Sequence, residues 1–553
     1  MFKLRLLFVV FILAFLLVIG RLFHLQFLVK KNSLESLYLQ TKKIFPERGK
    51  IYDRNGLPLA VNQTIYSMYF EPKKIKDDLD LIKKIDEIIK IGESTLSAKI
   101  DKTKDWVAVS NDLDKNTKNK ILSLNLSGVG FEESSKRFYP EASLAAHVLG
   151  FVGKDYQGDP IGYFGVEGYY DKDLVGFPGM LKTERDLLGR PIFIGTQEKI
   201  DQEDGRNLYL TIDRSVQAVI KKKLIQGLES YQAKEGCIIV ANPKTMEILG
   251  LSCLPDFDPD KYYSFSESFF KNQAISNLYE PGSIFKPFIM AAALEEKVIK
   301  KDDTYNEEGP IKLGEYSIQT WNNKYEGKIS MTRILEKSSN VGIVYVGEKL
   351  GQNKIYQYLN KYGFDKTTGI DLQGETVSYF KPKSSWYPID FSTVTFGQGI
   401  AVTPIQIIRA FSALVNGGKL LKPEIVKKIV SGTKESQIRS QVEQQVISET
   451  TSAIIRKMLW STVENGEMKW AKPEGYQIGG KTGTAQIPIK GHYDPTKTIA
   501  SFIGFAPVED PKFIVLVMLK EPKSSPWGSE TAAPLFFDVA KELLLYYNIA
   551  PEQ

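Results

Sequence analysis

The chain has 553 residues, and its 72 Lys and Arg against 66 Asp and Glu give a net charge of only +6. So small an excess argues against a dedicated nucleic-acid binder. Three His and two Cys exclude a His-rich metal site, a four-cysteine zinc site and a disulfide scaffold. We therefore expect about two to four domains whose hydrolytic or transfer chemistry uses Ser, Thr, Lys or carboxylates.

An apolar stretch from 6 to 20 follows Lys3 and Arg5 at the N-terminus. It is short for a membrane span, which needs about 20 residues, but snorkelling of Arg21 extends the helix to about Leu28. No small-residue cleavage site follows, so an uncleaved signal anchor is favoured over a signal peptide. Lys3 and Arg5 predict a cytoplasmic N-terminus, with the rest of the chain on the other side of the membrane.

The segments after the anchor are predominantly polar and charged. The sequence predicts a helix-compatible stretch over Lys30–Glu47, a strand-like stretch over 48–56 that ends in an Asn-Gly turn, charged helices over 64–130, an irregular turn-rich module over 137–189 and a linker over 201–206. A strand over Leu208–Ile212 follows. Asp213 is then placed to cap a helix over Ser215–Leu228.

The C-terminal half contains both strands and helices. Strands are predicted at Gly236–Ala241, Glu247–Leu251, 478–486, 499–506 and 513–519, and helices after Ser283, around 331–338 and at 404–416, 450–463 and 533–547. Short connections between the last strands imply an antiparallel sheet with helices packed on it. Cys237 and Cys253 lie in apolar, strand-like runs, where we expect two buried free thiols rather than a disulfide.

Two patterns near the C-terminus suggest chemistry that their surroundings contradict. A phosphate-loop pattern occurs at 475–482, but Pro473 and Glu474 precede it where a buried strand is needed. Gly483 and Pro488 disfavour the helix that should follow, so nucleotide binding is rejected. His492 stands among residues that predict a loop, and we do not expect it to be catalytic.

Ser-x-x-Lys occurs four times, and one copy has a distinctive context. Ser283 and Lys286 begin a segment that is apolar on nearly every side, which predicts a central helix. Desolvation there would lower the pKa of the lysine and let its neutral amine take the serine proton. The copies that begin at Ser268, Ser378 and Ser431 are interpreted as cap or loop serines with surface lysines.

Two further short motifs follow in the chain. Ser338-Ser339-Asn340 ends a short amphipathic helix, whereas the competing Ser123-Leu124-Asn125 lies in the charged N-terminal module. Lys481-Thr482-Gly483-Thr484 occurs once, after two glycines. Glycines in a strand allow a ligand or another backbone to approach closely.

The three motifs in this order resemble those of the penicillin-recognising serine transferases. Segments 48–56, 137–140, 165–168 and 211–217 resemble the pedestal of class B, monofunctional penicillin-binding proteins, and 395–406 resembles their cell-division and sporulation branch. Gln273 stands where this class would have Arg, a departure that leaves the chemistry untouched. The resemblance implies an α/β multidomain fold with a transmembrane anchor over 1–28, an elongated α+β pedestal of the dimerisation type over 29–205 and a transpeptidase domain over 206–553. The last would be β-lactamase-like, an antiparallel sheet flanked by helices.

The resemblance also implies a peptidoglycan D,D-transpeptidase that needs no metal and no cofactor. Ser283 would be the nucleophile, Lys286 the general base and Ser338 the proton relay to the leaving amine. The residues expected to bind substrate are Asn340, Lys481, Thr482, Gly483 and Thr484. Backbone N–H groups of Ser283 and Thr484 would form the oxyanion hole.

The partners implied are peptidoglycan stem peptides on lipid-linked or nascent glycan, β-lactam antibiotics, a SEDS-family glycosyltransferase and other division proteins, with no nucleic acid. We expect a single-pass protein of the inner (cytoplasmic) membrane with an extracytoplasmic catalytic domain, acting in septal synthesis. An elongation-type transpeptidase is the alternative. A D,D-carboxypeptidase, a β-lactamase, a penicillin sensor or a scaffold is less favoured. A class A lactamase needs a Glu with Asn four residues on, but Glu348 and Glu375 are followed there by Gln352 and Tyr379.

Overall fold

The computed structural model describes residues 2–24, 39–184, 197–489 and 492–551. It contains two compact units, one of Met1–Arg48 with Val175–Gly205 and one of Gly49–Leu174 with Arg206–Gln553. Most of the predicted pedestal therefore belongs to the same compact unit as the C-terminal region. The domain boundaries at 28 and 205 stay predictions, and the two units are described separately.

The first unit contains an apolar helix and a small sheet. Helix α1 spans Phe2–Phe23, and its 22 residues correspond to about 33 Å. By length and composition it can cross a membrane. Strand β8 (Gly179–Glu184) pairs antiparallel with β1 (Leu39–Ile44) and β9 (Gln197–Ile200). The helix expected over Lys30–Glu47 is thus wrong for the β1 residues, where pairing with β8 overrides local preference; 25–38 lie outside the described residues.

In the second unit, a curved sheet begins at β2 (Ile51–Tyr52), and the predicted Asn-Gly turn leads into β3 (Pro58–Phe70). Strands β4 (Val107–Leu113) and β5 (Val129–Phe138) pair with β3. Charged helices are predicted over 64–130, and three form there: α3 (Asp78–Ile89), α4 (Glu93–Ala98) and α5 (Lys115–Ser123). The prediction is wrong for 64–70 and 107–113, which belong to β3 and β4 and are fixed by strand pairing. Met68, Phe70 and Ile85 are fully buried in their shared core.

Short elements connect this region to the C-terminal part. They are α6 (Ala146–Leu149), β6 (Phe151–Lys154), β7 (Pro160–Tyr163), α7 (Gly165–Tyr169) and α8 (Asp171–Leu174), as expected of a turn-rich module. Strand β10 (Asn207–Leu210) pairs parallel with β2 and antiparallel with β20 (Val426–Ser431), beside β21 (Lys434–Gln437). One sheet therefore contains strands from both halves of the unit.

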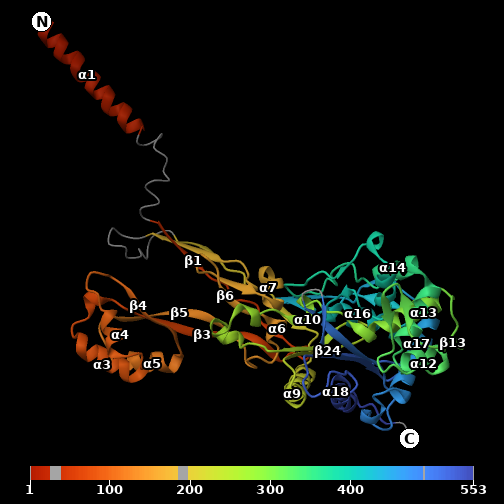
Figure 1. The fold of residues 1–553 in the computed structure, drawn as a ribbon. Coiled ribbons are helices and arrows are strands. Elements are labelled where there is room, and N and C mark those ends of the chain that lie inside the picture. Colours follow the sequence, from red (N-terminus) through yellow and green to blue (C-terminus); the bar gives the residue numbers. More distant parts are fainter. Residues whose placement is uncertain (1, 25–38, 185–196, 490–491, 552–553) are drawn as a thin grey trace. The chain divides into compact units, whose positions relative to one another are not determined.

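The C-terminal sheet confirms the predicted antiparallel architecture (Figure 1). Its order is β12-β11-β25-β24-β23, from β11 (Glu235–Ala241), β12 (Ile248–Leu254), β23 (Gly479–Ile489), β24 (His492–Ala506) and β25 (Phe513–Lys520). Helices α9 (Arg214–Tyr231) and α18 (Ala532–Tyr546) pack on it, and Asp213 caps α9 as predicted. Side chains of β11 alternate between two cores: Ile238 lies with α9 and α18, Ile239 with the remaining helices.

The remaining helices surround α11 (Lys286–Glu295), which is buried at nine of its ten positions. They are α10 (Gln273–Ser276), α12 (Met331–Glu336), α13 (Asn340–Leu350), α14 (Gln352–Lys361), α15 (Pro388–Val394), α16 (Pro404–Val415) and α17 (Glu449–Asn465). Small two-stranded sheets pair β13 (Thr304–Glu307) with β16 (Gly327–Ser330), β14 (Ile311–Leu313) with β15 (Tyr316–Ile318), β17 (Tyr379–Phe380) with β18 (Ile400–Ala401) and β19 (Lys419–Leu421) with β22 (Val442–Gln445). Helix α11 contacts α13, α14, α16 and α17, which confirms its predicted central place.

Two local predictions near the sheet are wrong. Cys237 and Cys253 form a disulfide rather than two free thiols, with Cα atoms 4.1 Å apart. A register shift between Val240 and Ala241 moves Cys253, instead of Ser252, opposite Cys237. His492 is the first residue of β24 and pairs with Ile489, so it lies in a strand and not in the predicted loop.

A buried ion pair ties the turn-rich module to the curved sheet. Arg137 of β5 donates from Nε to Glu167 of α7 at 2.7 Å, and neither side chain has more than 4% of its area exposed. Arg137 also donates to Asn62 at 3.0 Å. Removing the carboxylate would leave a guanidinium ion buried without its counter-ion.

We expect Glu167→Ala to lower the free energy of unfolding by about 3–5 kcal/mol. Asp173→Ala, which removes the half-exposed partner of Arg206 at 2.8 Å, should cost less than about 1 kcal/mol. Urea denaturation of the detergent-solubilised chain, followed by tryptophan fluorescence, measures both. Equal losses in the two variants would contradict the role of the buried pair.

Candidate active site

Ser283 lies at the entrance to the central helix. A 3₁₀ turn over Gly282–Phe285 carries it directly into α11, with Pro287 in the first helical turn where its missing N–H costs nothing. Gly282 adopts φ +59°, a backbone conformation that suits glycine. The serine is thereby held at one end of a helix that is buried at nine of its ten positions.

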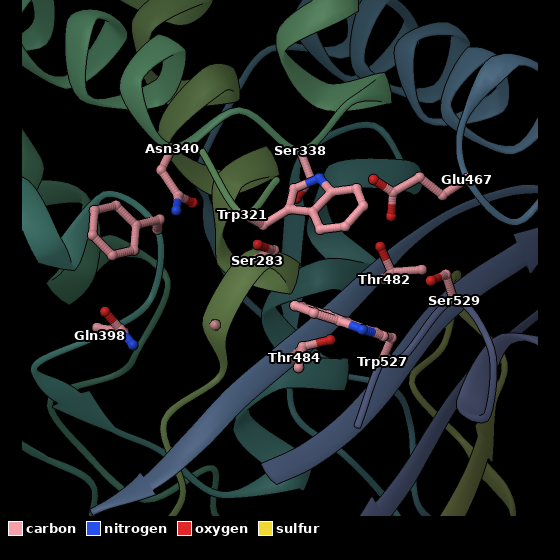
Figure 2. Close-up of a pocket in the computed structure, with 12 residues that line it drawn as sticks. Ser283, Trp321, Ser338, Asn340, Gln398, Glu467, Thr482, Thr484, Trp527 and Ser529 are labelled. Carbon is pink, nitrogen blue, oxygen red and sulfur yellow. The ribbon is translucent and has the colours of Figure 1, made fainter. Parts of the chain in front are cut away.

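The three sequence motifs meet at one pocket, which encloses about 110 Å³ (Figure 2). The residues that line it are Gly282, Ser283, Trp321, Ser338, Asn340, Phe396, Gln398, Glu467, Thr482, Thr484, Trp527 and Ser529. Lys286 and Lys481 lie beneath this lining, fully buried or nearly so. The competing motif at Ser123 is in α5 and its C-terminal turn, outside the pocket.

Lys286 connects the first motif to the second. Its Nζ lies 2.5 Å from the Ser338 carbonyl oxygen, 3.2 Å from the Ser338 hydroxyl and 2.8 Å from Asn340 Oδ1. Burial first, and then repulsion by Lys481, hold the pKa of the Lys286 amine well below its ordinary value. A neutral amine at this place can accept a proton.

Lys481 approaches the same hydroxyl from β23. Its Nζ lies 3.0 Å from Ser338 Oγ and 3.2 Å from both the carbonyl and the hydroxyl of Thr482. Burial lowers the pKa of Lys481 to about 8, against the attraction of Glu467. Since Lys481 continues into a strand and not a helix, the phosphate-loop interpretation stays rejected.

The turn between α12 and α13 presents Ser338 with φ +57°. Ser339 caps α13 by accepting from the Gly342 N–H at 2.9 Å, and it donates to the buried Glu307 carboxylate at 2.5 Å. Glu307 also accepts from Lys337 at 2.6 Å. Glu307 therefore fixes the second motif from behind, a contribution that its surface-like sequence Tyr-Asn-Glu-Glu did not indicate.

Gly483 allows β23 to approach the segment that contains Ser283. A Cβ there would lie 2.4 Å from Ser501 Oγ and 2.9 Å from the Ile284 side chain. Thr484, on the pocket wall, accepts from the Gly528 N–H at 3.0 Å. The free edge of β23 thus borders the pocket within the described residues, because β23 pairs only with β24 in the C-terminal sheet.

Several pocket residues were not anticipated from sequence. Trp321 and Trp527 have ring centroids 5.3 Å apart and are 45% and 37% exposed. Large exposed aromatics in polar, glycine-rich loops are the one signal that could have found them. Glu467 and Ser529 carry no such signal, and Gln398 was recognised only as part of a longer resembling segment.

Gly397 shapes the floor of the site. It has φ +78°, and a Cβ there would lie 2.3 Å from the Gly282 carbonyl oxygen. Gly399, two residues on, has φ +77° but its nearest neighbour would be 3.5 Å away. An alanine at Gly399 would therefore cost only the unfavourable backbone conformation. An alanine at Gly397 would cost the same conformation and also a collision with Gly282.

We expect Gly399→Ala to lower the free energy of unfolding by about 1 kcal/mol and Gly397→Ala by about 3 kcal/mol or more, because only the latter displaces Gly282. Thermal unfolding of the two variants beside wild type measures the difference. Indistinguishable variants would show that the Gly282 segment yields freely.

Comparisons with known proteins agree with this geometry. Residues 236–541 match the penicillin binding protein transpeptidase domain, and 43–210 match the penicillin-binding protein dimerisation domain. Stage V sporulation protein D of Bacillus subtilis is 37% identical over 99% of this chain and 86% of its own length. Peptidoglycan D,D-transpeptidase FtsI of Escherichia coli K12 is 29% identical over 98% of this chain and 90% of its own.

The fold agrees as well. The crystal structure of penicillin binding protein 2X from Streptococcus thermophilus superposes with a TM-score of 0.79 at 24% identity, covering 92% of this chain and 80% of that one. Both the domain matches and the near full-length relatives point to one family. The chain belongs to the class B penicillin-binding proteins, with a dimerisation domain followed by a transpeptidase domain.

Proposed function

We propose that the protein is a serine D,D-transpeptidase that cross-links peptidoglycan stem peptides through an acyl-serine intermediate. The observation that carries the proposal is the hydroxyl of Ser338, which lies within 3.2 Å of both lysine Nζ atoms in the pocket of Ser283. This arrangement can remove the proton of Ser283 and deliver a proton to the leaving amine without a histidine.

In acylation, Ser283 Oγ forms a bond to the carbonyl carbon of the penultimate D-Ala. Neutral Lys286 accepts the serine proton, and the backbone N–H groups of Ser283 and Thr484 stabilise the oxyanion, each worth about 3–4 kcal/mol in comparable enzymes. The C–N bond then breaks, and the terminal D-Ala leaves as an amine after receiving a proton through Ser338. The products are the acyl-enzyme and free D-Ala.

Substrate binding falls to the residues around this reaction centre. The positive charge of Lys481 and the hydroxyls of Thr482 and Thr484 fit the terminal carboxylate of the donor stem. The Asn340 amide contacts the peptide and also holds Lys286 at 2.8 Å. Gly483 keeps the strand edge close enough for these contacts.

In the second half-reaction, the side-chain amine of another stem attacks the ester carbonyl. A C–N bond forms, the C–O bond to Ser283 breaks, and the serine regains a proton. A carboxypeptidase or a β-lactamase would instead transfer the acyl group to water. A β-lactam acylates the same serine by opening its ring, so no leaving group departs to make room for an acceptor.

The N-terminal helix supports a location outside the cell for this chemistry. With Lys3 and Arg5 in the cytoplasm, α1 would anchor the chain in the inner membrane and the catalytic domain would lie on the extracytoplasmic side. We favour a septal role over an elongation role because residues 395–406 resemble the cell-division and sporulation branch. The relatives at 37% and 29% identity are a stage V sporulation protein and FtsI. The chain would then work beside a SEDS-family glycosyltransferase and other division proteins.

We expect a membrane-impermeant fluorescent penicillin to label the protein on intact spheroplasts, because the pocket would face outward, and the Ser283→Ala variant to take up no label. Gel fluorescence measures both. Labelling of Ser283→Ala would overturn the nucleophile assignment, and labelling only after lysis would overturn the orientation. Loss of the label within minutes would favour a β-lactamase over a transpeptidase.

We expect a fluorescent fusion of the full chain to gather at the division septum. Chemical cross-linking of the same cells should join the fusion protein to a SEDS-family protein. A fusion spread along the lateral wall would support the elongation alternative. The same strain carrying Ser283→Ala in place of wild type should fail in septal cross-linking, whereas a sensor or scaffold would still support division.

A further inference from the structure

Glu467 is a carboxylate that the proposed acylation steps do not use. It follows α17 in the turn before Lys469 and is exposed at the pocket mouth, beside Thr482 and Ser529 in Figure 2. The Trp321 side chain lines the same pocket, and it favours the ionised carboxylate. Glu467 therefore shares the pocket wall with an aromatic side chain that favours its charge.

Two carboxylates, Glu307 and Glu467, act on the buried lysines of the site, and they differ in their other partners. Glu307 attracts Lys286, but it already accepts from Lys337 and Ser339. Glu467 attracts both Lys286 and Lys481, and among the described residues it is the charged group that raises the pKa of Lys481.

The other charged group near Glu467 opposes its ionisation. Glu530, exposed beyond Ser529, repels the carboxylate, whereas Lys481 and Lys286 favour it. Partial desolvation by the pocket walls is the larger effect and raises the pKa of Glu467. The ionised state therefore depends on the two lysines and on the Trp321 indole.

We propose that Glu467 is a positioning residue that acts as counter-ion to Lys481, keeping it protonated beside neutral Lys286 and thereby setting the pH range in which Ser283 is acylated. This inference rests on the proposed function. The reaction needs two neighbouring lysines in opposite protonation states, although their ammonium groups would repel each other across a single hydroxyl. The Glu467 carboxylate lies at the mouth of the pocket. It therefore lets Lys481 stay charged, and no further ion has to be buried.

The sign of the effect on each lysine is the same. Removing the carboxylate removes an attraction that raises the pKa of both Lys286 and Lys481. The acid limb of the acylation profile, set by deprotonation of Lys286, moves to lower pH. The alkaline limb is set in wild type by loss of the Lys481 proton, whose pKa is about 8, and it also moves to lower pH.

The test is the rate of acylation by a fluorescent penicillin as a function of pH, on the full detergent-solubilised chain. For Glu467→Gln we expect both limbs to move down by about 0.5–1 pH unit, which lowers the rate at pH 9 by about 3–10-fold and leaves or raises it at pH 6. Glu467→Asp keeps the charge and should restore most of the wild-type profile. Trp321→Phe, which keeps a ring but loses the N–H donor, should shift the limbs in the same direction by less.

Glu464→Gln is the matched control. Glu464 is on the same helix end but pairs with Lys472, and it has no resolved effect on either active-site lysine. We expect its pH profile to equal that of wild type. A profile for Glu467→Gln that keeps its limbs, or falls equally at every pH, would overturn the counter-ion role, and so would a longer-lived label, which would make Glu467 a deacylating base. Failure of wild type to be labelled would instead refute the proposed function.

Discussion

The meeting of two buried lysines at the Ser338 hydroxyl is the interaction on which the catalytic domain depends. Each Nζ lies within 3.2 Å of the same oxygen, although one lysine belongs to α11 and the other to β23. Removing an ammonium group from water is costly unless it is paired or neutral. A surrounding structure that cannot relax is needed to hold both lysines in place.

The fold meets this need by fixing the three segments independently. Helix α11 is surrounded by helices, so Lys286 cannot turn toward solvent. The Ser338 turn is held from behind by the buried Glu307 carboxylate. Strand β23 packs against α17. There the Thr462 hydroxyl donates to the Gly480 carbonyl, next to Lys481. Each segment therefore has contacts in addition to those with the other two.

The sequence predicted the parts of this site that local pattern determines. An apolar helix beginning at Ser283 and the one Lys-Thr-Gly were visible because spacing and polarity are properties of a single segment. Glu307 and Glu467 were not, because each acquires its role from a partner far along the chain. The Cys237–Cys253 disulfide was not predicted for a related reason. It depends on a bulge that changes the register of β11 and β12 by one residue. The β1 strand likewise exists only through its pairing with β8.

Lysine, in place of histidine, makes the chemistry depend on the exclusion of water. The pKa of Lys286 is low because of burial first, and because of Lys481 second. A stem peptide that fills the pocket removes more water and so favours the neutral form of Lys286. In the proposed mechanism, the carboxylate of the same peptide would lie near Lys481 and Thr482 and favour the charged form of Lys481. Substrate binding would then increase the difference in protonation between the two lysines, toward the pair of states that the proposed acylation requires.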